Sequence, residues 1–401
     1  MKKPVYIVVV PFFPSSQSWR GGFFFDFVSA LMRTGKYEVV VICSGSGEDY
    51  VYNGIFVHKV KLFRLPFGFA SYLFRPRNSK RIRRKILDTG ISWNDVVVFH
   101  SHGFVGAGCF GWIKKNYPHV KTLLHNHSGP LFHLANLRFG VIPIEADLIY
   151  CSFLRIFQNT DLLVCCSDIQ AHNTGKWYRD GYLNPPVDVR EDLLTGRWMI
   201  PWHVKNTYVL YNGIDKRIFN ENGRNEKRNG FVIGCVGNVN KEKGQMTLLR
   251  AIPRVVGKIE GLRVVLVGAG PNMQECMRYV ADNGLADIVE FRKEVDHLDL
   301  PRLYRSFDLL VIPSIIEGFC CSYVEAFGCG TPFMGCRGVS VEEAFSDEEK
   351  DKWLIAPGND AELAVKIESY YRERPKQHLV QDFDIDCLIA DFVDYLQRLL
   401  I

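Results

Sequence analysis

The stretch DLLVIPSIIEGFCCSYVEAFGCGTPF, residues 308–333, shows the pattern on which the fold prediction rests. Its apolar start predicts a buried β-strand over 308–314, and Cys321 and Ser322 begin a predicted helix that carries Glu325 inward. Gly318 indicates a turn between the two elements, so Glu317 ends a loop. A strand that passes through a short loop into a helix is the unit from which parallel sheets with helices on their faces are built.

The same unit recurs along the rest of the chain. In the second half, helical patterns over about 245–257 and 271–282 alternate with strand-like runs at 231–237, 262–268 and 288–293. In the first half, a helix is predicted over about 23–33, and strands are predicted at 5–10, 37–43, 95–100, 120–126, 161–167 and 207–212. Short runs of this kind are typical of buried parallel strands. The sequence therefore predicts an α/β protein with doubly wound sheets.

A polar segment rich in Asn and Gly, residues 216–230, separates the two halves. We expect one domain over 1–215, a second over 216–379 and a terminal helix over 380–401, whose packing side the sequence leaves open. Residues 1–215 contain 25 Lys and Arg against 15 Asp and Glu, a balance of +10, whereas residues 216–401 contain 24 against 29, a balance of −5. The basic half is expected to meet something anionic.

The composition excludes several classes of protein. The chain has 401 residues, of which 47% are hydrophobic and 23% charged, so it is neither disordered nor fibrous nor a small disulfide scaffold. The apolar run 5–10 is too short to span a bilayer, and the prolines after it favour a strand over a signal peptide. The twelve cysteines are scattered without a C-x2-C pair, which indicates free thiols in the cytoplasm and gives no support to a cysteine zinc site.

Glu317 and Glu325 carry the strongest chemical signal. They flank the predicted helix start directly after a strand, and ligands of open α/β sheets bind beyond the carboxyl ends of strands. The free N–H groups of a helix start favour a phosphate, and a carboxylate accepts hydrogen bonds from sugar or ribose hydroxyls. A capped and solvated helix start is the alternative interpretation of the same residues.

This segment resembles the E-x7-E motif of retaining glycosyltransferases of the group 1 superfamily, which is similar to family 4. Other landmarks occur in the order that this family shows: Gly21-Gly22, LLHNHSG (123–129), VCCSD (164–168), LYNGID (210–215), GNVNKEKG (237–244) and LVGAGP (266–271). The resemblance covers about residues 5–360. It implies the GT-B fold, in which two Rossmann-like doubly wound domains face each other across a cleft.

The resemblance also assigns roles to residues. Glu325 matches the glutamate that binds the nucleotide ribose, Glu317 the one beside the donor sugar, and Lys243 the lysine that neutralises the donor diphosphate. His125 matches the histidine near the transferred sugar, and the segment around Arg292 would meet the base. The resemblance thus implies three catalytic residues, namely His125, Glu317 and Lys243.

The residues that the resemblance implies for donor binding are Gly22, Asn238, Lys243, Arg292, Gly318, Phe319, Cys320, Cys321, Ser322 and Glu325.

These roles imply a transfer without a metal or other cofactor. Charge that builds on the departing diphosphate is stabilised by Lys243 and by helix N–H groups, and the anomeric configuration of the sugar is retained. The implied donor is a UDP-, GDP- or ADP-sugar. The implied acceptor is a saccharide or lipid-linked saccharide of surface polysaccharide or lipopolysaccharide synthesis.

Two residues depart from the family pattern. Asn238 stands where the family has arginine, and Cys320 stands where it has glycine, beside the expected diphosphate path. Two alternatives therefore stay open, a nucleotide-sugar epimerase of the same fold and a non-catalytic protein that binds nucleotide sugars. A dehydrogenase is disfavoured because LVGAGP lacks the third glycine of a dinucleotide fingerprint.

His100 and His102 form an H-x-H pair at a strand end, which is a pattern that binds metals in some proteins. Its third ligand would be His125 or His127. We favour the simpler interpretation, in which these histidines line the acceptor cleft or bond to the loop backbone, and we expect no metal. His125 is preferred over His127 as the active-site histidine because it directly follows the apolar strand.

The stretch 62–87 is aromatic first and then densely basic. Ile82 and Ile86 lie one helical turn apart, which predicts an amphipathic helix with a basic outer face over residues 75–85. Such a helix suits an anionic membrane surface, although an ordinary solvated helix has the same pattern. No nucleic-acid-binding motif accompanies it, so we expect a cytoplasmic protein, peripheral on the inner face of the membrane, without a nucleic-acid partner.

Overall fold

The computed structural model describes residues 2–16, 18, 20–63, 75–127, 155–173, 206–223 and 230–401. Contacts divide the chain into two compact units. Unit 1 consists of Met1–Tyr211 with Asp386–Ile401, and unit 2 consists of Asn212–Ile385. The terminal helix therefore belongs to unit 1.

Unit 1 contains an eight-stranded sheet in the order β3-β4-β2-β1-β5-β6-β7-β8. All neighbouring strands in it are parallel except β3, which runs antiparallel to β4. The strands are β1 (Val5–Val10), β2 (Glu38–Ser44), β3 (Tyr50–Tyr52), β4 (Ile55–Val60), β5 (Val96–His102), β6 (Lys121–Asn126), β7 (Leu162–Cys165) and β8 (Thr207–Val209). The parallel order confirms the predicted α/β class for this unit, and β5 continues two residues beyond its predicted end, so that it includes His102.

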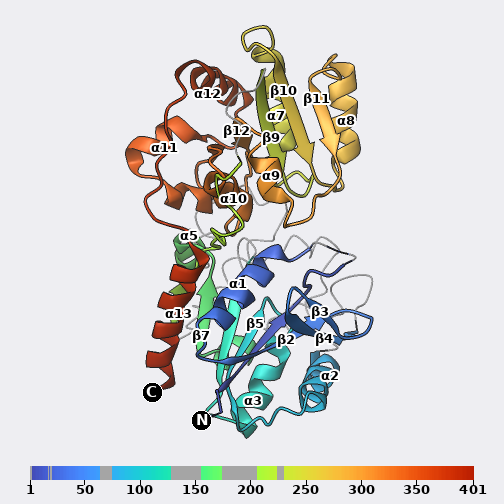
Figure 1. The fold of residues 1–401 in the computed structure, drawn as a ribbon, viewed down its shortest axis with the longest axis vertical. Coiled ribbons are helices and arrows are strands. Elements are labelled where there is room, and N and C mark those ends of the chain that lie inside the picture. The colour runs from blue at the N-terminus through green and yellow to red at the C-terminus, as the bar shows by residue number, and fades with distance from the viewer. Residues whose placement is uncertain are drawn as a thin grey trace, which may run out of the picture. The chain divides into compact units, whose positions relative to one another are not determined.

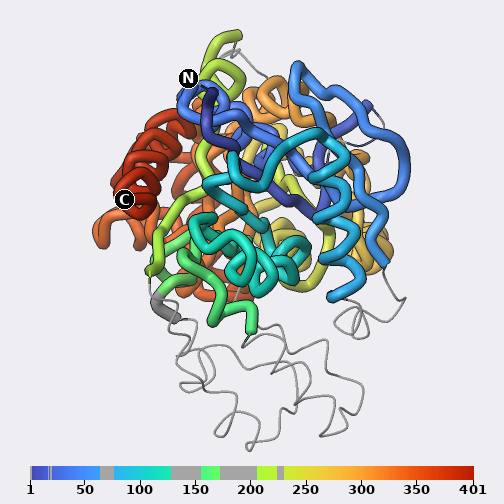
Figure 2. The backbone as a smooth tube through the Cα atoms, turned by 90° about the horizontal axis from the view of Figure 1, so that it is seen from below, coloured from blue at the N-terminus to red at the C-terminus, as the bar shows by residue number. Residues whose placement is uncertain are grey.

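The helices of unit 1 are α1 (Gly22–Arg33), α2 (Arg75–Asp88), α3 (Phe110–Asn116), α5 (Asp168–Asn173) and α13 (Ile385–Leu400). The C-terminal α13 lies beside the N-terminal elements in both views (Figures 1 and 2). Arg33 on α1 donates from Nε to Asp386 on α13 at 2.9 Å, and Phe392 packs against the ring of Tyr208. The end of the chain thus covers the sheet formed by its beginning.

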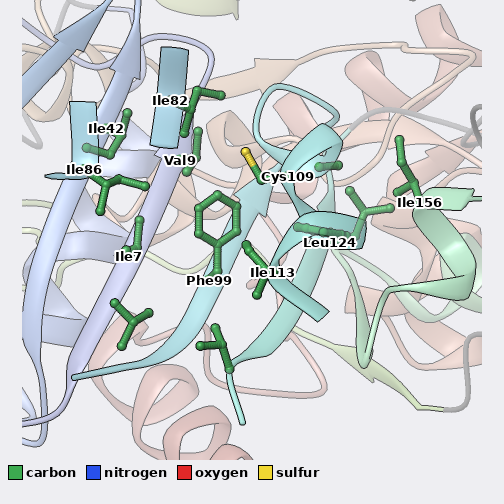
Figure 3. Packing of buried hydrophobic residues seen from close by; sticks show 14 of the residues in the cluster. Ile7, Val9, Ile42, Ile82, Ile86, Phe99, Cys109, Ile113, Leu124 and Ile156 are labelled. Carbon is green, nitrogen blue, oxygen red and sulfur yellow. The ribbon is translucent and has the colours of Figure 1, made fainter. Parts of the chain in front are cut away.

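The core of unit 1 forms where α2 and α3 cover the sheet. Figure 3 shows Phe99 of β5 among aliphatic side chains of the neighbouring strands and of Ile113 on α3. Ile82 and Ile86 of α2 are both fully buried in this cluster. The predicted amphipathic helix is therefore confirmed, because its apolar stripe packs on the sheet and removes that surface from water.

Unit 2 contains a six-stranded parallel sheet in the order β11-β10-β9-β12-β13-β14. Its strands are β9 (Phe231–Val236), β10 (Leu262–Val267), β11 (Val289–Arg292), β12 (Leu309–Val311), β13 (Phe333–Cys336) and β14 (Leu354–Ile355). Its helices are α7 (Gln245–Ala251), α8 (Met273–Asp282), α9 (Leu300–Tyr304), α10 (Cys321–Gly328), α11 (Asp347–Trp353) and α12 (Asp360–Glu373). The predicted helix over 245–257 ends at Ala251 and continues as a 3-10 turn, because Pro253 has no N–H to donate within a longer helix.

None of the helices in the described ranges combines the length and the apolar character that crossing a bilayer requires.

Candidate functional site

Unit 2 gathers Lys243, Glu317 and Cys320 at the carboxyl ends of β9 and β12. The Lys243 ammonium forms an ion pair with Glu317 and donates to the Cys320 sulfur at 3.2 Å. Ser314 donates to Glu317 Oε1 at 2.8 Å, and Ser340 donates to the Glu317 carbonyl at 3.0 Å. Both partners of the ion pair are largely buried, with side chains 18% and 13% exposed. The loop after β12 thus holds a carboxylate against a cation that comes from the loop after β9.

The turn that carries Lys243 requires glycine at the next position. Gly244 has φ +71°, and a Cβ there would lie 2.1 Å from the carbonyl oxygen of Pro313. The main-chain N–H of Ile315 also donates to Glu242 at 2.8 Å, which joins this turn to the β12 loop. Backbone contacts therefore fix the position of Lys243 beside Glu317.

Burial alone would lower the pKa of Lys243, but Cys320 and Glu317 together raise the pKa above its usual value. Burial raises the pKa of the Cys320 thiol. At neutral pH the site therefore presents a protonated ammonium and a neutral thiol beside the carboxyl group of Glu317. Such a set can hold an anion through the lysine and hydroxyl groups through the glutamate.

Helix α10 begins directly after Cys320 and carries the second predicted glutamate. Glu325 is only 6% exposed, and its Oε2 accepts a hydrogen bond of 2.6 Å from the hydroxyl of Tyr304 on α9. Burial, reinforced by Glu325, raises the pKa of Tyr304 well above its usual value, so the hydroxyl stays a donor. Sequence reasoning missed Tyr304, although a buried tyrosine hydroxyl needs a hydrogen-bond partner.

Four of the other predicted donor-binding residues frame this site. Gly318 and Phe319 are buried, Cys321 and Ser322 form the partly exposed first turn of α10, and Asn212 donates to the Phe319 carbonyl at 2.8 Å. Asn238 is exposed in the loop after β9, where its carbonyl accepts from Gln245 at 2.9 Å. Arg292 ends β11 and pairs with Glu290. The structure thus brings Lys243, Glu317 and Cys320 into direct contact, whereas Arg292 is held by its neighbour on the same strand.

His125 and Gly22 lie in unit 1. Gly22 is buried as the first residue of α1, and Gly21 before it has φ +99°. His125 is 2% exposed on β6 and belongs to a stack of imidazoles with His100, His102 and His127. Burial holds the pKa of each of these histidines below the usual value, to about 3 for His127, so the rings are neutral at pH 7.

Comparison with known proteins identifies the family of this chain. Residues 230–373 match the family of glycosyl transferases group 1, and residues 23–182 match glycosyltransferase family 4. The chain belongs to this glycosyltransferase family. The D-inositol 3-phosphate glycosyltransferase of Saccharomonospora viridis is 30% identical over 281 residues, which are 66% of this chain and 59% of that protein. The chain therefore aligns with less than two thirds of that curated glycosyltransferase.

Solved structures of similar fold align with nearly the full length of the chain. Sucrose-phosphate synthase from Thermosynechococcus elongatus superposes with a TM-score of 0.70 at 15% identity, covering 99% of both chains. HepE from Anabaena in complex with UDP and glucose superposes with a TM-score of 0.65 at 18% identity, covering 98% of this chain and 99% of its own. The predicted family and the GT-B fold are thus confirmed.

Proposed function

We propose that this protein transfers a sugar from a nucleoside diphosphate sugar to an acceptor hydroxyl, with the donor bound in unit 2. The observation that carries the proposal is the ion pair between Lys243 and Glu317 beside the start of α10. A helix start and a fixed ammonium together form a site for an anion. The family membership supports the nature of that anion, a sugar diphosphate.

The transfer breaks the bond between the sugar C1 and the diphosphate oxygen and forms a bond from C1 to the acceptor oxygen on the same face of the sugar. The proton of the acceptor hydroxyl passes to the departing diphosphate, on which negative charge grows. Lys243 stabilises that charge because its raised pKa keeps it protonated. Glu317 then turns from partner of Lys243 to acceptor of sugar hydroxyls. The proposed reaction retains the anomeric configuration and needs no metal at the diphosphate. The predicted contact of His125 with the sugar stays a prediction.

A melting-temperature panel with UDP, GDP, ADP and their sugars, without and then with magnesium, tests the donor site. We expect one nucleotide to raise the melting temperature without magnesium, because ligand binding stabilises the folded state by mass action. The nucleotide that binds is then supplied as a labelled sugar with saccharide and lipid-linked acceptors, and the product anomer is read by NMR.

Each alternative function gives a different result in the same experiment. Isomerised donor without an acceptor would indicate an epimerase. Binding without any turnover would indicate a non-catalytic protein, a result that Cys320 favours because its sulfur contacts Lys243. The absence of binding by every nucleotide would contradict the donor site itself.

We also propose that unit 1 meets an anionic membrane surface through α2, where a lipid-linked saccharide would be presented. Ile82 and Ile86 face the core, and the opposite face exposes Arg77, Lys80, Arg81 and Arg84 with the half-exposed Leu87. Two other cations of α2 contact side chains of unit 1 itself: Arg83 lies over the Trp112 ring, and Lys85 forms an ion pair with Asp49. A row of cations beside an apolar side chain suits anionic headgroups.

Co-sedimentation with vesicles of anionic and of neutral lipids tests this surface. The variant changes Arg77, Lys80 and Arg84 to glutamate, and a matched control changes the exposed Lys3, Lys36 and Lys115 of the same unit. We expect the α2 variant alone to lose binding to anionic vesicles, because each cation near the surface contributes about 1 kcal/mol. Equal binding by both variants would contradict the proposed surface.

A further inference from the structure

Three histidines of unit 1 share one face of the sheet at the ends of neighbouring strands. His100 and His102 are two positions apart on β5, so their side chains point to the same side. His125 on β6 lies directly opposite His102 in the parallel register. The ring centroids of the three are 4.3 to 5.3 Å apart, and each residue is at most 2% exposed.

Each of these rings has one nitrogen held by a polar neighbour. His100 Nδ1 lies 2.8 Å from the Tyr6 hydroxyl, and His102 Nδ1 lies 2.7 Å from Nε2 of His127. His125 Nε2 lies 3.6 Å from the sulfur of Cys166. These three neighbours fix the orientation of the rings.

The second nitrogen of each ring is buried and receives no hydrogen bond from any described residue. These atoms are Nε2 of His100, Nε2 of His102 and Nδ1 of His125. Buried polar atoms in folded proteins are almost always paired, and an unpaired group calls for a ligand such as a water or an ion. Three such atoms on adjacent rings point to a single ligand with several coordination positions.

We propose that His100, His102 and His125 bind one divalent transition-metal cation of the zinc type. One ligand atom from each ring lies within 4.8 Å of the others. Nitrogen ligands around tetrahedral zinc are about 3.3 Å apart, given bonds of about 2.0 Å. Binding therefore requires the rings to approach one another by up to about 1.5 Å and to turn from their nearly parallel stack toward the cation. A cation takes one unprotonated nitrogen from each imidazole, and one nitrogen of each ring is free of hydrogen bonds to the described residues.

The surrounding hydrogen bonds match the pattern of metal-bound histidines. A bound imidazole donates its other N–H to a nearby acceptor, which orients the ring and raises its basicity. Here the Tyr6 hydroxyl, His127 Nε2 and the Cys166 sulfur lie where they can accept the N–H of His100, His102 and His125, in the tautomers that metal binding requires. This site gives His125 a role other than contact with a transferred sugar, and it does not depend on the proposed donor site of unit 2.

Cobalt binding to the full chain tests the proposal, because Co²⁺ replaces zinc and absorbs visible light according to its coordination. After treatment with a chelator, the protein is titrated with Co²⁺ and then with Zn²⁺. We expect one equivalent to bind with the intense visible bands of four- or five-coordinate cobalt, without the near-ultraviolet band of a cobalt–thiolate bond, and Zn²⁺ to displace it. No saturable uptake of either metal would overturn the proposal.

Variants separate this site from its neighbours. His102→Gln is expected to weaken binding at least 100-fold, whereas the control His119→Gln, at an exposed histidine of the same unit, leaves it unchanged. Tyr6→Phe removes only an outer partner and is expected to weaken binding roughly 10-fold to 100-fold. A thiolate band in the wild type that Cys166→Ser removes would overturn the proposal in favour of the second group, His125, His127 and Cys166. This spectrum decides the ligand set even if His102→Gln does not fold.

Discussion

Both units place polar side chains at the carboxyl ends of neighbouring parallel strands, but the two clusters differ in charge and in pairing. In unit 2, Lys243 and Glu317 form an ion pair, and backbone turns hold them. In unit 1, His100, His102 and His125 are neutral, stand on the strands themselves and each leave one ring nitrogen unpaired among the described residues.

This difference indicates that the two sheet edges bind ligands of opposite charge. A paired cation can exchange its carboxylate partner for a bound anion, so the unit 2 cluster suits a diphosphate. Unpaired lone pairs of neutral imidazoles suit a cation. The same position in two similar sheets thus supports different chemistry, because the chemistry depends on the side chains and not on the fold.

The largest expected effect concerns the cation of the unit 2 cluster. Lys243→Ala removes the ammonium that faces the proposed diphosphate, and we expect kcat/KM for the donor to fall by about 100-fold to 1000-fold, as for other fixed groups that stabilise developing charge. Steady-state kinetics with the donor identified by the binding panel provide the measurement.

Lys241→Ala is the matched control for this variant. Lys241 lies two residues away on the same loop but is exposed, and we expect its removal to change kcat/KM less than threefold. If the two variants lost activity equally, the loop as a whole would attract the donor by its charge, and the contact with Glu317 would not matter.

The second prediction tests the claim that backbone turns hold the unit 2 cluster. Gly244→Ala places a Cβ against the Pro313 carbonyl at a positive φ, and we expect a loss of about 3 kcal/mol in the free energy of unfolding. Gly257→Ala is the control, because Gly257 also has a positive φ but no atom lies within 4 Å of the added Cβ, so its loss is about 1 kcal/mol. Urea denaturation of both variants measures the difference. Equal losses in the free energy of unfolding would show that the backbone moves to accommodate the added Cβ beside Pro313.

Much of the fold could be predicted because its strands are short runs of buried apolar residues. The run 5–10 corresponds to β1, and Ile82 and Ile86 are buried as their spacing indicates. The hairpin of β3 and β4 was not predicted, since it mixes buried and exposed residues and exposes Val51 and Phe56. Pattern analysis detects burial, and an edge hairpin buries too little to show a pattern.

The candidate site depended more on resemblance than on pattern. Lys243 and Glu317 are 74 positions apart in the sequence, so only the packing of the two loops after β9 and β12 brings them together. The bond from Tyr304 to Glu325 likewise requires α9 to pack against α10. The H-x-H pattern located His100 and His102 in the sequence. Which nitrogen of each ring stays unpaired depends on the rotation of the side chain, and the sequence does not specify that rotation.

The third prediction concerns acid stability of the histidine cluster without metal. A histidine whose pKa is lower in the folded state stabilises the protein above the unfolded pKa of about 6.5, and this stability is lost as the pH falls below that value. Each buried ring therefore contributes a slope of about 1.4 kcal/mol per pH unit in this range. The polar groups that contact the rings do not compensate, because burial also raises the pKa values of Tyr6 and Cys166 and keeps both neutral.

Urea denaturation in the presence of a chelator, at pH 6.5 and pH 5.0, measures this dependence. We expect His102→Gln to lose about 1.7 kcal/mol less stability than the wild type over this interval, because one fewer ring must take up a proton on unfolding. The control His119→Gln, at an exposed position, should follow the wild type. Parallel pH dependences of all three proteins would show that His102 titrates normally in the folded state.

The smallest expected effect concerns a single hydrogen bond in unit 2. Tyr304→Phe keeps the buried ring but removes the donor to Glu325, and we expect affinity for the ribonucleotide to fall about tenfold, or about 1.4 kcal/mol. Calorimetry with the nucleotide and its 2′-deoxy analogue measures the effect, and Tyr279→Phe on α8 is the control. If Tyr304 orients Glu325 toward the ribose, the variant loses most of its preference for the ribonucleotide. If both affinities fell together, Tyr304 would support the fold of unit 2 and the ribose assignment of Glu325 would lose its basis.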